Sequence, residues 1–221
     1  MLGKAALILE KDLRTELHAR DILTAMAYFS LLVLIIFNFA IDLREVSVDA
    51  VAPGILWVSF AFAGVLGLNR SFVREQERGA IEGLMLCPMD RSAIYLGKFA
   101  GNVVFMLTVE VLTVPVFVVM FNLSALGFGL LPALVLGTIG FASLGTLFAA
   151  LAVNTRTREV MLPVLLFPLL VPIVISAVKA TGYAIGTIAP AQAIPWLNLM
   201  VVFDLVFVVV SYLIFGYVLE E

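Results

Sequence analysis

Six long apolar runs constrain what this chain can fold into more than any other feature of its sequence. The runs cover residues 22–41, 51–68, 99–121, 130–153, 160–178 and 195–219. A helix needs about 20 predominantly apolar residues to cross the hydrocarbon core of a bilayer. The strands of a membrane β-barrel would instead show short segments of about ten residues with alternating polar and apolar side chains. The sequence therefore predicts an all-α integral membrane protein with six transmembrane helices.

The composition excludes the common soluble classes. Of the 221 residues, 63% are hydrophobic and 13% are charged, whereas a soluble domain carries about 25% charged residues. The 13 basic and 16 acidic residues are nearly balanced, which gives no signature of a nucleic-acid partner. Cys87 is the only cysteine and His18 the only histidine, so an internal disulfide and a histidine-rich metal site are both excluded.

Lysine and arginine are distributed unevenly among the segments that join the runs. Eleven of the 13 basic residues lie within 1–21, 69–98 and 154–159, and the opposite connections hold only Arg44 and Lys179. Loops rich in basic residues stay on the cytoplasmic side of a membrane. The bias therefore predicts that both termini are cytoplasmic. The first run is too long for the apolar region of a signal peptide, so we expect an uncleaved first span.

Residues 1–21 predict an amphipathic helix before the first span. Its apolar side chains recur at spacings of three and four, which places them on one helical face. They are Leu2, Ala6, Leu9, Leu13 and Leu17. Glu16 and Arg20, four residues apart, would pair on the remaining surface. Such a helix lies in the headgroup region of a membrane or packs on a soluble partner, and the periodicity does not separate these alternatives.

Residues 69–98 form the longest predicted cytoplasmic connection. In a helix, Phe72, Glu75, Gly79 and Glu82 would share one face, because they follow one another at steps of three and four. An apolar cluster follows and ends at Pro88, which disfavours helix at the residue before it. An exposed apolar cluster surrounded by charges is typical of a docking surface. We predict a helical hairpin that docks a partner, the alternative being a solvated loop whose apolar residues rest on the membrane.

Two carboxyl groups fall inside the spans. Glu110 is about twelve residues into the third run and Asp204 about ten into the sixth. A charged carboxylate at the centre of a membrane helix costs about 2.5–3.5 kcal/mol on insertion scales. Both side chains are therefore candidates for a substrate path or a proton-sensitive contact. The equally weighted alternative is a neutral packing residue hydrogen-bonded to Asn38 or Asn102.

Two further patterns concern how the helices meet and end. Gly97 and Gly101 lie four residues apart, a spacing that allows two helices to approach closely. Residues 179–195 are too apolar for a free loop and too interrupted for a span. We expect this segment to form a short re-entrant hairpin at the outer surface.

The sequence has no motif that would make it an enzyme by itself. A phosphate-binding loop needs two glycines separated by four residues, followed by lysine and serine or threonine, and no such run occurs. The six runs contain no histidine, the commonest strong ligand of haem iron. No catalytic residue, metal site or bound cofactor is therefore predicted, and haem would have no evident ligand here.

Three segments resemble the heme exporter protein B (CcmB) family. They are the interface segment LEKDLRTELHAR, the connection SFVREQERGAIEGLMLCPMDRSAIYLGK and the fifth-span run LLFPLLVPIVI. The connection is the most specific of them, with phenylalanine, acid, glycine, glutamate and proline at Phe72, Glu75, Gly79, Glu82 and Pro88. The resemblance covers nearly the whole chain, including its length and its six-span layout.

The resemblance implies a fold and a set of partners. The fold is like that of type-2 ABC exporters: one transmembrane domain over 1–221, with an interface helix at 1–21 and a coupling helix within the cytoplasmic loop 69–98. The implied assembly is a homodimer of permeases in the bacterial inner membrane with a separate CcmA-like ATPase, which binds ATP and Mg²⁺. CcmC-like and CcmD-like membrane proteins and a CcmE-like haem chaperone are the other implied partners.

The implied function is that of the permease of a cytochrome c maturation transporter. ATP hydrolysis on the partner would be coupled to haem delivery or to release of the haem-loaded chaperone. One alternative is a type-2 ABC permease for another lipid-like substrate. A second is an ion or proton carrier that uses Glu110 and Asp204 without an ATPase, and a third is a passive scaffold for a haem-handling complex.

Overall fold

The computed structural model describes residues 2–41, 47–77, 83, 90–123, 127–153 and 158–218, and its regular structure is helical. The helices are α1 (Leu2–Ala19), α2 (Asp21–Ala40), α3 (Val48–Glu77), α5 (Arg91–Met120), α6 (Leu130–Val153), α7 (Arg158–Ile185) and α8 (Pro190–Val218). Six of them, α2 to α8, are long and apolar enough to cross a membrane. The prediction of an all-α membrane protein with six spanning helices is confirmed. The predicted coupling face begins at Phe72 and Glu75 on the end of α3, and its residues beyond Glu77 lie outside the described residues apart from Gly83.

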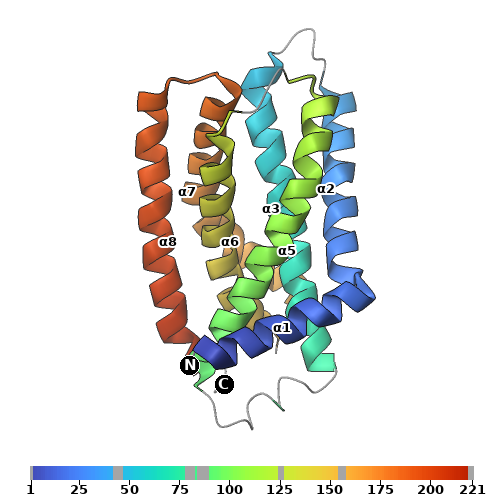
Figure 1. Ribbon diagram of the computed structural model, residues 1–221, viewed down its shortest axis with the longest axis vertical. Coiled ribbons are helices and arrows are strands. Elements are labelled where there is room, and N and C mark those ends of the chain that lie inside the picture. Colours follow the sequence, from blue (N-terminus) through green and yellow to red (C-terminus); the bar gives the residue numbers. More distant parts are fainter. Residues whose placement is uncertain are drawn as a thin grey trace.

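The six long helices run side by side along one direction, and α1 crosses them at one end of the bundle (Figure 1). Both chain termini lie near that same end (Figure 1). In the described part, α6 packs against α3, α5, α7 and α8, and together with α3 it is the most buried of the spanning helices. It has no charged residue, which suits a helix enclosed on most sides by other helices.

Glycines on α6 let its neighbours approach closely. A Cβ at Gly137 would overlap the indole ring of Trp57 on α3, and one at Gly145 would overlap the side chain of Leu68. Between membrane helices there is little hydrophobic driving force, so close packing of small residues and hydrogen bonds hold them together. The hydrogen bond from Trp57 Nε1 to Thr181 Oγ1, 2.9 Å long, then joins α3 to α7.

The interface helix α1 packs on α5, and the glycine pair of α5 makes this contact close. A Cβ at Gly97 would lie 2.7 Å from Cβ of Ile8 and 2.9 Å from the carbonyl oxygen of Ala5. The predicted apolar stripe lies beside the most buried face of α1 and only partly packs: Leu2 and Leu17 are exposed and Leu13 packs on the core, whereas Ala5 and Ile8 are buried. An apolar strip beside the packed face remains available to the bilayer, as an interface helix requires.

The corner between α1 and α2 differs from the sequence prediction for Glu16. Its side chain is buried, and its Oε1 accepts hydrogen bonds from the backbone N–H groups of Ile22 (2.8 Å) and Leu23 (2.9 Å). The first N–H groups of a helix have no partner within the helix, so Glu16 satisfies two of those of α2. Arg20 makes the turn with φ of 55°, in the left-handed region that non-glycine residues rarely occupy.

The prediction of a re-entrant hairpin over 179–195 is wrong. Helix α7 continues to Ile185, and α8 begins at Pro190. Gly186, with φ of +88°, ends α7, and the amide of Thr187 donates to the carbonyl of Gly182 over 2.9 Å. These features form the Schellman motif that commonly ends helices. Proline at the first position of α8 is equally typical of a helix start, so the two helices are joined by a short turn.

Candidate functional site

Glu110 lies inside the bundle and is held by one hydrogen bond. Its side chain is 1% exposed, and Thr138 Oγ1 on α6 donates to its Oε1 over 2.6 Å. Its other oxygen, Oε2, has no hydrogen-bond partner among the described residues. The predicted partners Asn38 and Asn102 are used elsewhere: Asn38 donates to the carbonyl of Met120, and Asn102 to Thr146 Oγ1.

Asp204, the middle residue of α8, is buried without a donor. Its exposed fraction is 6%, and neither carboxyl oxygen has a hydrogen-bond partner in the described part of the chain. It faces α6 at Gly140, where an added Cβ would lie 2.5 Å from Asp204 Oδ1. The absence of a side chain at Gly140 therefore provides the space that the carboxyl group occupies.

The uncharged helix α6 brings these two acids to nearly the same depth. Thr138 contacts Glu110 on α5, and Gly140 contacts Asp204 on α8. Successive helical residues are rotated by about 100°, so positions two apart point to roughly opposite sides of α6. The two carboxyl groups therefore flank α6 on opposite sides, and they do not form a joint pair.

The arrangement can serve proton or polar-substrate chemistry, because three of the four carboxyl oxygens have no hydrogen-bond partner in the part of the chain that the structure describes. An unpartnered polar group buried in apolar surroundings costs free energy that a hydrogen-bonded group does not. In membrane helices such acids are functional candidates by default. The alternative role for both acids is that of neutral packing residues. In the described residues, no three His, Cys, Asp or Glu side chains gather into a possible metal site.

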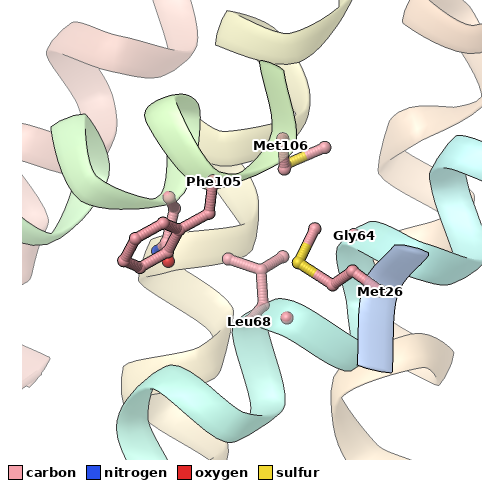
Figure 2. A pocket seen from close by; sticks show the side chains of 7 residues that line it. Met26, Gly64, Leu68, Phe105 and Met106 are labelled. Atoms are coloured by element: carbon pink, nitrogen blue, oxygen red, sulfur yellow. The ribbon is translucent and has the colours of Figure 1, made fainter. Parts of the chain in front are cut away.

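A small crevice lies between α2, α3 and α5 (Figure 2). Figure 2 shows the side chains of Met26, Leu68, Phe105 and Met106 converging on it beside Gly64. Its empty volume is about 160 Å³, but it is too narrow to admit a water molecule. We therefore regard it as a packing gap between flexible methionine side chains, not as a binding cavity.

The predicted coupling residues are placed only in part. Phe72 belongs to α3 and its side chain is 3% exposed, so it lies in the core and not on a docking surface. Glu75 is also on α3, but its side chain is not among the described ones. Gly79, Glu82 and Pro88 lie outside the described residues. Their role in docking stays a prediction.

A buried ion pair that sequence reasoning missed lies at the end of the bundle where α1 crosses. Lys98 Nζ on α5 is 2.9 Å from Asp12 Oδ2 on α1, and the side chains of Lys98 and Asp12 are 2% and 11% exposed. The same ammonium group lies 5.6 Å from the ring centre of Phe72 on α3. In the sequence, Lys98 is one of many basic loop residues. Its closeness to Gly97 and Gly101 was the available signal that it faces a neighbouring helix.

Comparison with known proteins gives the family. The family model described as CcmB protein matches residues 4–220 of this chain.

The chain belongs to the CcmB family.

Several relatives that carry the name heme exporter protein B support this membership. The relative from Rhodobacter capsulatus is 31% identical over 169 residues, which are 76% of this chain and 78% of the relative. The relative from Paracoccus denitrificans is 30% identical over 196 residues, 88% of each chain. The one from Pseudomonas aeruginosa is 27% identical over 193 residues, 87% of this chain and 86% of the relative. The six long helices of this CcmB-family chain, and α1 from its third residue onward, fall within the region matched by the family model.

Proposed function

We propose that this chain is the permease subunit of an ABC transporter for cytochrome c maturation, driven by a separate ATPase. The observation that carries the proposal is the CcmB match across residues 4–220, together with relatives named heme exporter protein B. The chain has no phosphate-binding loop in its sequence. The energy of ATP hydrolysis must therefore reach it through contact with another chain.

The proposed role is to transmit movement from the ATPase, so that haem is delivered or the haem-loaded chaperone is released. In this proposal haem is the cargo of the complex, and the spans, which lack histidine, offer it no evident ligand. The crevice in Figure 2 is far too small for a porphyrin. This supports a subunit that moves within a complex and does not hold haem in the core of one bundle.

The proposed assembly is a homodimer of this chain in the bacterial inner membrane. Its partners would be a CcmA-like ATPase carrying ATP and Mg²⁺, CcmC-like and CcmD-like membrane proteins, and a CcmE-like chaperone. Both termini would be cytoplasmic, which is supported by the basic-residue bias and by their position at one end of the bundle (Figure 1). A membrane-impermeant thiol reagent should then label Cys87 only from the cytoplasmic side. Labelling of Cys87 from outside intact cells would contradict this topology.

The proposed docking surface for the ATPase is the connection that carries Glu75, Gly79, Glu82 and Pro88. Gly79→Trp should abolish binding of the ATPase, because a bulky side chain would block close approach. Glu82→Ala should weaken binding or uncouple hydrolysis. Breaking a buried charge pair on one side costs about 3–5 kcal/mol, against at most about 1 kcal/mol for an exposed pair.

The test is a pull-down of the ATPase with the detergent-solubilised chain, together with the ATPase rate. Glu10→Gln is the control, because Glu10 forms an exposed pair with Arg14 on α1. Wild-type recovery and wild-type hydrolysis in both loop variants would overturn the docking assignment. An ATPase assay with and without the haem-loaded chaperone then tests the substrate. Stimulation of ATP hydrolysis by another lipid-like compound, and not by the haem-loaded chaperone, would favour an exporter of that compound.

The second candidate function is an ion or proton carrier that works without an ATPase. The observation that favours it is Asp204, which is buried at the middle of α8 and whose two carboxyl oxygens have no hydrogen-bond partner among the described residues. Proton flux into vesicles that contain the purified chain alone, lost in Asp204→Asn, would support this candidate. Failure of any ATPase to co-purify with the chain would support it further.

A further inference from the structure

The buried ion pair between Asp12 and Lys98 joins three helices at the end of the bundle where α1 crosses. Asp12 comes from α1, Lys98 from the beginning of α5, and Phe72, which lies under the ammonium group, from the end of α3. Helices α3 and α5 are the two stems of the connection proposed to receive the ATPase. One lysine side chain of the α5 stem therefore contacts both α1 and the α3 stem.

The surroundings of this pair make the contact specific. The lysine side chain is 2% exposed, and a buried charge is tolerated only when it is paired and hydrogen-bonded. Asp12 Oδ2 faces Lys98, and its Oδ1 lies 3.0 Å from the half-exposed Nζ of Lys11. The ammonium of Lys98 gains a further attraction from the face of the Phe72 ring.

The packed face of α1 continues from this pair to the first spanning helix. Asp12 and Glu16 are four residues apart and therefore lie on the same side of α1. Glu16 holds the first turn of α2 through the amides of Ile22 and Leu23. In the other direction, the backbone of α1 at Ala5 lies against Gly97 of α5. Helix α1 is thus fixed to α5 at one side and to α2 at its end.

We propose that Lys98 is a positioning residue that makes α1 move together with both stems of the α3–α5 connection, so that α1 carries a displacement of this connection to α2. The inference rests on the proposed function, because it takes the displacement to come from a docked ATPase. Asp12 and Lys98 act through the helices that they join. They determine whether the interface helix follows the connection when nucleotide binds.

The experiment measures movement of α1 in the assembled complex. A fluorophore sensitive to its environment is attached at Leu17→Cys, an exposed position near the end of α1, in a Cys87→Ser background. Its emission is recorded with the purified ATPase before and after addition of ATP and vanadate. The variants are Asp12→Asn, Lys98→Met and the exchanged pair Asp12→Lys with Lys98→Asp.

We expect the nucleotide-dependent change in emission to fall about fivefold or more in each single variant. A factor of about five is the lower end of typical coupling between two sites. Recovery of the ATPase and its basal hydrolysis should stay at the wild-type level. The exchanged pair should regain most of the response. The control Glu10→Gln removes a charge from an exposed pair on the same helix and should respond as the wild type does.

The possible results separate this inference from the function on which it rests. Wild-type responses in Asp12→Asn and Lys98→Met, with ATPase bound, would overturn the role of the pair and leave the permease assignment intact. A bound ATPase with no response at α1 in the wild-type protein would also overturn it. Failure of the wild-type chain to bind the ATPase would overturn the proposed function itself, and the transmission role with it. If Lys98→Met does not fold, Asp12→Asn and the exchanged pair decide.

Discussion

Replacing Glu16 with alanine should loosen the corner between α1 and α2. Oε1 of Glu16 accepts two backbone hydrogen bonds, of 2.8 Å from Ile22 and 2.9 Å from Leu23. The corner also contains Arg20 in a left-handed conformation, which costs about 1–2 kcal/mol for a residue with a Cβ. Without the carboxylate, two amides at the start of α2 lose their acceptor while the unfavourable turn remains.

The size of the effect follows from the burial of Glu16. Hydrogen bonds to a charged group contribute about 1.5–3 kcal/mol each, whereas removing a helix cap costs about 0.5–2 kcal/mol where water can replace it. The side chain of Glu16 is 2% exposed, so replacement by water is restricted. We expect Glu16→Ala to lower the free energy of unfolding by about 2–3 kcal/mol. Glu16→Gln keeps a carbonyl acceptor and should lose about 1 kcal/mol.

Hydrogen exchange measured by NMR in detergent micelles tests this directly. A loss of about 2 kcal/mol corresponds to roughly 30-fold faster exchange of the Ile22 and Leu23 amides, since 1.4 kcal/mol is a factor of ten. Glu10→Ala is the matched control, because its pair with Arg14 is exposed and contributes at most about 0.5 kcal/mol. Equal exchange rates in Glu16→Ala and Glu10→Ala would refute the assignment of Glu16 as the residue that holds the corner.

Two other substitutions test the packing of α1 and the role of the intramembrane acids. Gly97→Ala should destabilise the protein by about 1–3 kcal/mol through overlap with Ile8. Gly101→Ala, whose Cβ would lie 3.8 Å from its nearest neighbours, should be neutral or stabilising. Thermal unfolding in detergent that ranks the two variants in the opposite order would contradict the α1–α5 contact. Glu110→Gln and Asp204→Asn should reduce cytochrome c maturation while the complex stays assembled, because each removes an ionisable intramembrane group. Full maturation in both single variants and in the double variant would leave only the packing interpretation.

The helix ends show which helix boundaries can be predicted from the sequence. Helix α6 begins and ends at the residues expected from its apolar run, Leu130 and Val153. Helix α7 continues beyond the expected end at residue 178, through Lys179, to Ile185, because Gly186 is the residue that takes the positive φ. A charged residue near the end of a span does not stop a helix, whereas a left-handed glycine does.

The environment of each acid could not be predicted in the same way. The sequence shows that Glu110 and Asp204 lie deep in apolar helices, but their neighbours come from α6, which is distant along the chain. That Thr138 would donate to one, and that Gly140 would leave room for the other, depends on how α6 is rotated between α5 and α8. Rotation about a helix axis is set by packing with all neighbours at once.

The sequence by itself determined that this protein is a six-helix membrane protein with an amphipathic helix before its first span. Bilayer thickness and the need to satisfy every backbone hydrogen bond in lipid allow few other solutions for such apolar runs. Only the tertiary structure decided that Lys98 pairs with Asp12, that Glu16 holds α2, and that the apolar stripe of α1 lies beside its packed face. These contacts join residues from different helices, and their geometry exists only once the helices have packed against one another.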